Sequence, residues 1–184
     1  MEQLKVGPDH RHTIASIAES LRRRAEQLEP AFSTRQIIDA CFPGTIVTGR
    51  HLPRGVDDVV KVDPRAFRTH RAPHVIVYQR ELPTSHQRHA IAHALGHIIF
   101  DGAEHRGCQH YDAARELRCD RFADELLVPL VEIRPYVCAW PSPDPDAHEV
   151  FLDMVDQIAS HFHVPSSCIH RRIQDLRSHA SFSE

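Results

Sequence analysis

The segments of this chain that favour β-strands all lie together, and helical patterns precede and follow them. β-branched runs bounded by Pro and Gly predict strands over residues 45–51, 57–62 and 74–79. A doubly wound parallel sheet needs a helix between successive strands, whereas strands grouped in this way pair mainly with one another. The order of segments therefore predicts an α+β fold with a small sheet of three strands or more.

Helical periodicity accounts for most of the remaining chain. Before the strands, we expect an amphipathic helix that ends near Leu28 and a short helix from Ser33 or Thr34 to Cys41. After the strands, we expect helices over 85–100, from 112 or 113 to 126, and over 130–139, 147–162 and 166–178. The arrangement predicts two N-terminal helices, a sheet, a central pair of helices and a helical C-terminal tail.

The chain has 184 residues, which fits one compact domain over residues 1–184, with a core at about 12–178. The Pro-rich segment 140–146 leaves a helical appendage at 141–184 as an alternative. A formal net charge of −3 argues against a protein that mainly neutralises nucleic-acid phosphates. The sequence contains neither a signal-peptide pattern nor an apolar run of membrane-spanning length, so we expect a cytoplasmic protein and no membrane partner.

The histidines of the predicted helix 85–100 are the most informative feature for function. His93 and His97 are four residues apart, so both imidazoles lie on one helix face, where they can bind one tetrahedral metal ion. The pair is weak evidence by itself, because the chain has 16 histidines and His89 stands at the same spacing from His93. We expect His86 and His89 to lie at the rim of a cleft, and a His-lined metal tract is the alternative.

Acidic residues on the next predicted helix strengthen the interpretation as a metal site. Glu116 lies near the beginning of that helix, and an antiparallel helix pair can bring it to the histidine face. Asp120, four residues later, can accept the outer N–H of a ligand histidine and so fix its tautomer and orientation. Gly96 allows another backbone to approach the first helix closely beside the site.

These segments resemble the ImmA/IrrE family of zinc metallopeptidases, which have a gluzincin-type site. In that family, H-E-x-G-H on one helix is followed on the next by Glu, then Asn or Asp, then Phe-Ala, Leu-Leu and Pro. This chain has HALGH at 93–97 and ELRCDRFADELLVP at 116–129. The similarity extends over about 12–178, with its motifs at 88–129. Its most specific matches are Phe122, Ala123, Leu126, Leu127 and Pro129.

The resemblance implies that His93, His97 and Glu116 are the ligands of a Zn²⁺ ion and that Asp120 supports one of the histidines. It also implies a zinc-dependent endopeptidase that cleaves a specific protein. A helix-turn-helix repressor or another neighbour-encoded protein would be the substrate, in a stress response or in the control of mobile elements and defence.

The resemblance further implies that the substrate adds as a strand along the sheet edge above the metal. A peptidase cleft also needs a hydrogen-bond donor for the oxyanion of the tetrahedral intermediate. His110 and Tyr111, in the loop between the two site helices, are our candidates for this donor.

The sequence departs from the family at Ala94, which stands where the family has its catalytic glutamate. A methyl group cannot take a proton from water, and losing a general base commonly costs about 10²–10⁴-fold in rate. We therefore expect the sequence as written to bind zinc and substrate but to be catalytically inactive. An engineered replacement of Glu by Ala is favoured because the rest of the site is intact. A natural pseudopeptidase that acts as a protein-binding or regulatory module is the alternative.

Other charged residues favour ordinary surface roles. The arginine run at 22–24 is typical of a solvated helix face, and we expect Glu132 and Arg134 at the surface. The two N-terminal helices, at about 13–42, superficially resemble a helix-turn-helix. The second of them carries Arg35 as its one basic residue, so we do not expect direct binding to nucleic acid.

Overall fold

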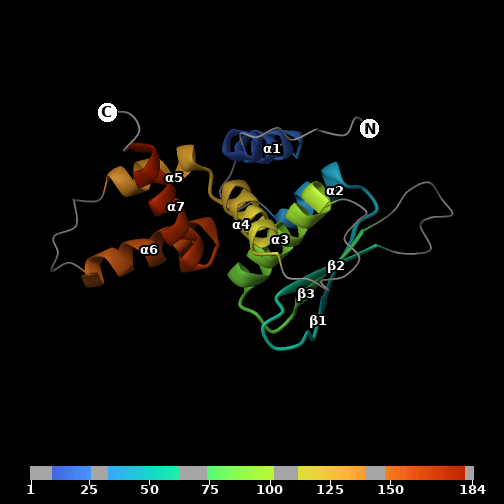
Figure 1. The fold of residues 1–184 in the computed structure, drawn as a ribbon. Coiled ribbons are helices and arrows are strands. Elements are labelled where there is room, and N and C mark those ends of the chain that lie inside the picture. Colours follow the sequence, from blue (N-terminus) through green and yellow to red (C-terminus); the bar gives the residue numbers. More distant parts are fainter. Residues whose placement is uncertain (1–9, 26–32, 63–73, 102–111, 140–147, 181–184) are drawn as a thin grey trace.

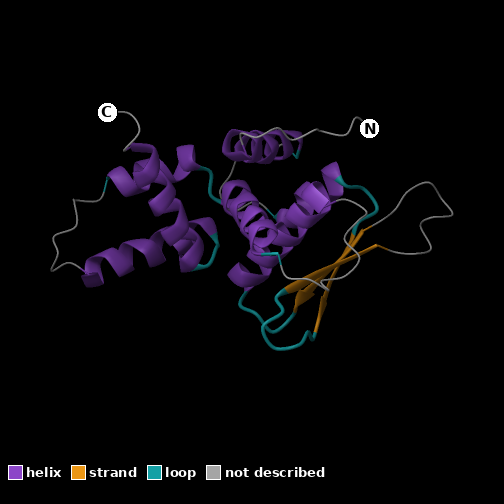
Figure 2. Ribbon diagram, in the orientation of Figure 1, coloured by secondary structure: helices purple, strands orange, loops and turns teal. Residues whose placement is uncertain are grey.

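The computed structural model describes residues 10–25, 33–62, 74–101, 112–139 and 148–180. Within these ranges the chain forms an α+β fold, which confirms the predicted class (Figure 2). The elements in chain order are α1 (His10–Arg24), α2 (Thr34–Cys41), β1 (Ile46–Arg50), β2 (Asp58–Val62), β3 (His74–Gln79), α3 (Thr84–Asp101), α4 (Ala113–Leu127), α5 (Leu130–Cys138), α6 (His148–Phe162) and α7 (Ser166–Ala180). The first helix ends before Leu28, which lies outside the described residues.

The three strands form one sheet in the order β1-β3-β2, with β1 parallel and β2 antiparallel to β3. Ile76 of the central strand is fully buried and pairs with Val47 of β1 and Val60 of β2. Because alternate residues of a strand point to the same face, Asp58 lies on the same face of β2 as the buried Val60. Helix α3 packs against β2 and β3 and covers this face.

Helices α3 and α4 pack against each other at the centre of the molecule (Figure 1). Helix α1 packs on α4, and α5, α6 and α7 lie on the other side of α4 from the sheet. Gly96 permits the close approach that we predicted, because a Cβ at this position would lie 3.1 Å from the Cα of Cys119. No helix in the described part of the chain is long and apolar enough to cross a membrane.

Arg22 corrects one of the surface predictions. Its side chain is buried, and it donates hydrogen bonds to the carbonyl oxygen of Leu126 and to Glu132. The last carbonyls of a helix lack partners within the helix, and Arg22 satisfies one of them where α1 crosses the end of α4. The prediction that Arg22 is solvated is therefore wrong, whereas Glu132 is partly exposed and Arg134 is exposed as expected.

Candidate metal centre

Three potential ligand atoms converge between α3 and α4. His93 Nε2 lies 3.1 Å from His97 Nε2 and 3.2 Å from Glu116 Oε2, and His97 Nε2 lies 3.6 Å from the same oxygen. Zinc–ligand bonds of about 2.0–2.2 Å at tetrahedral angles place neighbouring ligand atoms about 3.3–3.6 Å apart. The observed separations are close to these values, so the three residues can bind one small cation together.

Carboxylates behind the two imidazoles determine which ring nitrogen faces the centre. Asp120 Oδ1 lies 2.8 Å from His93 Nδ1, and Asp101 Oδ2 lies 2.7 Å from His97 Nδ1. An ionised carboxylate accepts hydrogen bonds, so each Nδ1 carries a proton and donates it. In the neutral imidazoles, both Nε2 atoms then direct lone pairs toward Glu116. Three acceptors at this separation repel one another unless a proton or a metal ion lies between them.

The surrounding charges make His93 a strong base. Burial by itself would lower the pKa of His93, but the hydrogen bond to Asp120 and the charges of Asp58, Asp120 and Glu116 raise it to about 9. At neutral pH and without a metal ion, His93 therefore holds an additional proton. A metal ion has to displace this proton in order to bind, as is usual for histidine ligands.

Asp101 is a site residue that the sequence analysis missed. Its carboxylate is almost fully buried, and Arg115 Nε and Arg118 Nη2 each lie 3.0 Å from its Oδ1. Burial alone would raise the pKa of Asp101, but the hydrogen bonds from His97 and Arg115 lower it overall, so Asp101 stays ionised. The signal was present in the sequence, because Asp101 follows His97 by four residues on the same helix.

Asp58 of β2 is a second residue that the sequence analysis missed. Burial is the main cause that raises the pKa of this carboxyl to about 7; His93 opposes the increase and Glu116 adds to it. Asp58 lies on the sheet face that α3 covers, and its charge interacts with those of His93 and Glu116. No spacing in the sequence indicates this contact, because it depends on how the strand packs against the helix.

Cys119 lies beside the centre, on the Nδ1 side of His97. Its Sγ is 3.5 Å from His97 Nδ1, the nitrogen that already faces Asp101. Burial is the main cause that raises the pKa of the Cys119 thiol, so the sulfur remains protonated at neutral pH. The backbone and side chain of Cys119 lie against Gly96, so this residue forms part of the close contact between α4 and α3.

His89 contacts a different set of partners from His93. Its Nε2 lies 3.2 Å from Asp124 Oδ1 and 3.1 Å from Arg171 Nη2, so it is held between α4 and α7. Its side chain is mostly buried, and the position of His89 relative to a cleft stays a prediction. His86, in contrast, is exposed.

Ala94, at the position of the family's glutamate, is fully buried in the hydrophobic core. Alanine supplies no general base at this position, and its methyl group has no exposed surface. His110 and Tyr111, which we expected as oxyanion donors, lie outside the described residues.

The family model of the IrrE N-terminal-like domain, a peptidase family, matches residues 57–174. This match covers more than half of the chain, from the residue before β2 into α7, and the chain belongs to this family. The fold and the family together define a metallopeptidase-like α+β scaffold. No curated protein matches the chain.

Proposed function

We propose that this chain is a zinc-binding peptidase scaffold in which His93, His97 and Glu116 hold a Zn²⁺ ion. The observation that carries the proposal is the convergence of two Nε2 atoms and one carboxylate oxygen within 3.1–3.6 Å. Two imidazoles and one carboxylate leave a fourth tetrahedral position open, which is typical of catalytic zinc sites. Membership of a peptidase family supports the same conclusion.

The residues around the centre have distinct roles in this proposal. Asp120 and Asp101 hold the outer nitrogens of the two histidines, so that both rings present Nε2 to the same point. Arg115 and Arg118 keep Asp101 ionised and in place. When bound, zinc would polarise the scissile carbonyl and activate the attacking water.

The outer edge of β2 is the surface that we propose for the substrate. Among the described strands, β2 pairs with β3 alone, so one of its edges has no strand partner there. Gln79 N donates to Asp57 O, and in an antiparallel ladder the next residue, Asp58, then directs its backbone groups outward. An extended peptide that adds to this edge would pass beside the Asp58 side chain, which is coupled to His93 and Glu116.

We infer a protein substrate from membership of a peptidase family. A helix-turn-helix repressor or another neighbour-encoded protein, in a stress response or in the control of mobile elements, is the specific substrate that we propose. This part of the proposal rests on the resemblance of the HALGH and 116–129 motifs.

The alanine at position 94 is compatible with two forms of the proposal, an endopeptidase that lacks its base and a protein that only binds its partner. In the first, the scaffold is an endopeptidase that is inactive as written because position 94 lacks a base. In the second, the chain is a pseudopeptidase that binds its partner without cleaving it.

The test restores the base and compares it with a side chain of the same size. Ala94→Glu and Ala94→Gln are incubated with a neighbour-encoded repressor, with and without zinc and a chelator. We expect Ala94→Glu to cleave about 10²–10⁴-fold faster than the parent and to lose this activity with chelator. Ala94→Gln should stay as slow as the parent. If both variants fold and bind zinc but neither cleaves, the endopeptidase form is wrong and the binding form remains.

A further inference from the structure

The histidines of α3 and the acids of α4 form three successive cross-helix pairs. The residues advance by four along α3 while they decrease by four along α4, as expected for antiparallel helices in contact. We refer to the three pairs as the His–acid ladder: His97 with Glu116, His93 with Asp120, and His89 with Asp124. The first two pairs surround the proposed metal position, and the third lies one helical turn away.

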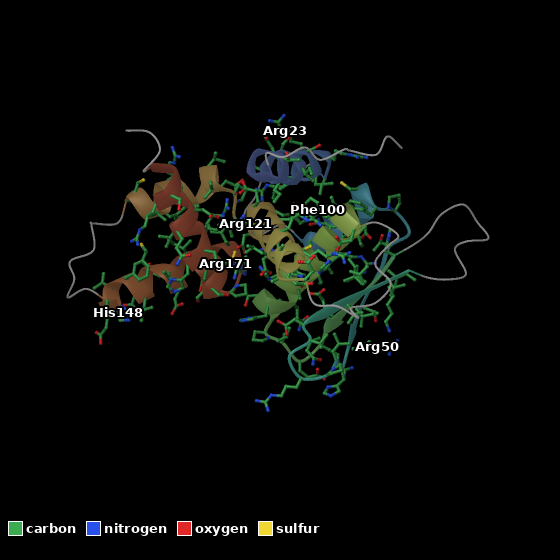
Figure 3. The ribbon with its side chains drawn as sticks, in the orientation of Figure 1. Arg23, Arg50, Phe100, Arg121, His148 and Arg171 are labelled. Atoms are coloured by element: carbon green, nitrogen blue, oxygen red, sulfur yellow. The ribbon has the colours of Figure 1, made fainter. Side chains whose placement is uncertain are left out.

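The third pair contains a guanidinium from α7. Arg171 donates from Nε to Asp124 Oδ2 at 2.5 Å and from Nη2 to Asp124 Oδ1 at 2.6 Å. The same Nη2 lies 3.1 Å from His89 Nε2. His89 Nε2 also lies 3.2 Å from Asp124 Oδ1, so the three side chains form one cluster between α3, α4 and α7. Figure 3 shows Arg171 extending between α7 and α4.

Asp124 depends on this contact because its side chain is almost completely buried. Burial alone would raise the pKa of Asp124, but the hydrogen bonds of Arg171 and His89 lower it to about 2. Without the guanidinium, the carboxylate is left without its main cation and has to take a proton or draw His89 toward itself. Either change moves side chains one turn from His93 and Asp120.

The ladder has little tolerance for such movement. A Cβ added at Gly96 would lie only 3.1 Å from the Cα of Cys119, so α3 and α4 are packed closely at this point. The three ligand atoms of the metal centre come from both helices, and their separations therefore depend on how α3 is aligned with α4. A shift of a few tenths of an ångström changes all the distances from α3 to Glu116.

We propose that Arg171 is a positioning residue of the metal centre, which fixes the third pair of the ladder and thereby the alignment of α3 with α4. This inference rests on the proposed function, because it concerns the geometry of the same three ligands. It makes α7 a part of the site, although Arg171 touches none of the ligands.

The test measures the zinc dissociation constant by competition with a chromophoric chelator. Arg171→Gln removes the charge, and Arg171→Lys keeps a charge but cannot bridge both oxygens of Asp124 and His89. We expect both variants to bind zinc about 10-fold more weakly, as do other changes to the groups that support metal ligands. Titrations are made below the onset of unfolding of every variant, as monitored by circular dichroism.

Arg172→Gln is the matched control. If α7 affected zinc binding only through the stability of the fold, this substitution would weaken zinc binding as much as Arg171→Gln does. Arg172 is the next residue on α7 and is buried, and it donates to Val128 O and Glu125 instead of to the ladder. We expect this variant to lose stability but to keep the zinc affinity of the parent. The resonances of the imidazole nitrogens, measured by NMR, should report a changed environment at His93 in the Arg171 variants alone.

Three outcomes separate the possible errors. If the parent does not bind one zinc ion per chain, the proposed function fails before the inference is tested. If the parent binds zinc and the Arg171 variants bind it equally tightly, or if Arg172→Gln weakens binding to the same extent, the inference is wrong. If Arg171→Gln does not fold, the double variant Asp124→Asn with Arg171→Gln removes both charges together and should show the same weakening.

Discussion

Asp101 Oδ2 lies 2.7 Å from Nδ1 of His97, one helical turn earlier on α3, and this contact determines which nitrogen of His97 faces Glu116. Asp120 has the same relation to His93, but it reaches across from α4. The two histidines are thus oriented by carboxylates from two different helices. Arginine side chains neutralise Asp101, so a buried negative charge can remain beside the centre.

Asp101→Asn should weaken zinc binding by about 10–100-fold, because an amide no longer fixes the tautomer of His97. The measurement is a zinc titration in competition with a chelator. Asp153→Asn, at an exposed position on α6, is the matched control and should bind zinc as the parent does. Equal affinity of Asp101→Asn and the parent would show that His97 does not need this carboxylate.

Gly96→Ala should destabilise the fold by about 1–3 kcal/mol, since the added methyl group meets the backbone of Cys119 at 3.1 Å. The same substitution should also weaken zinc binding, because it separates the helices that carry the ligands. Urea unfolding measures the first effect and a zinc titration measures the second. A variant that is as stable as the parent would mean that α3 and α4 can move apart without cost.

Asp124 should make the free energy of unfolding depend on pH in the acidic range. Its pKa falls from the ordinary value of 3.8 to about 2 in the fold, so the folded state favours the ionised form. The resulting stabilisation, on the order of 2 kcal/mol, is fully present above about pH 4 and is lost as the pH falls toward 2. Urea unfolding of the parent and of Asp124→Asn, between pH 6 and pH 2.5, tests this.

The difference in unfolding free energy between these two proteins should shrink as the pH falls. A difference that stays constant over this range would show that Arg171 does not hold Asp124 in its ionised form. Other carboxylates also titrate between pH 6 and pH 2.5, but they titrate in both proteins and so cancel in the comparison.

Local patterns were sufficient to predict the elements and much of the candidate site. A helix alone is enough to place His93 and His97 on one face. An antiparallel partner helix then brings Glu116 and Asp120 to the same face. Gly96 indicated the close approach of that partner helix, and the structure confirms it. Asp101 could have been identified by the same spacing of four residues.

Contacts between distant parts of the chain could not be predicted in this way. Arg22 belongs to a run of arginines that is typical of a solvated face, yet it is buried against residues more than 100 positions later. Arg171 and Asp58 reach the neighbourhood of the site through the packing of α7 on α4 and of β2 on α3. Periodicity shows which face of an element is buried but does not identify the element that covers it.

The zinc content of the purified protein, measured by elemental analysis, tests the central claim most directly. The variants His93→Ala and Glu116→Gln each remove one proposed ligand, and His86→Ala removes an exposed histidine of the same helix as a control. The account predicts one zinc ion per chain in the parent and in His86→Ala, and its loss in the two ligand variants. Absence of zinc from the parent, or zinc that is retained without His93, would contradict it.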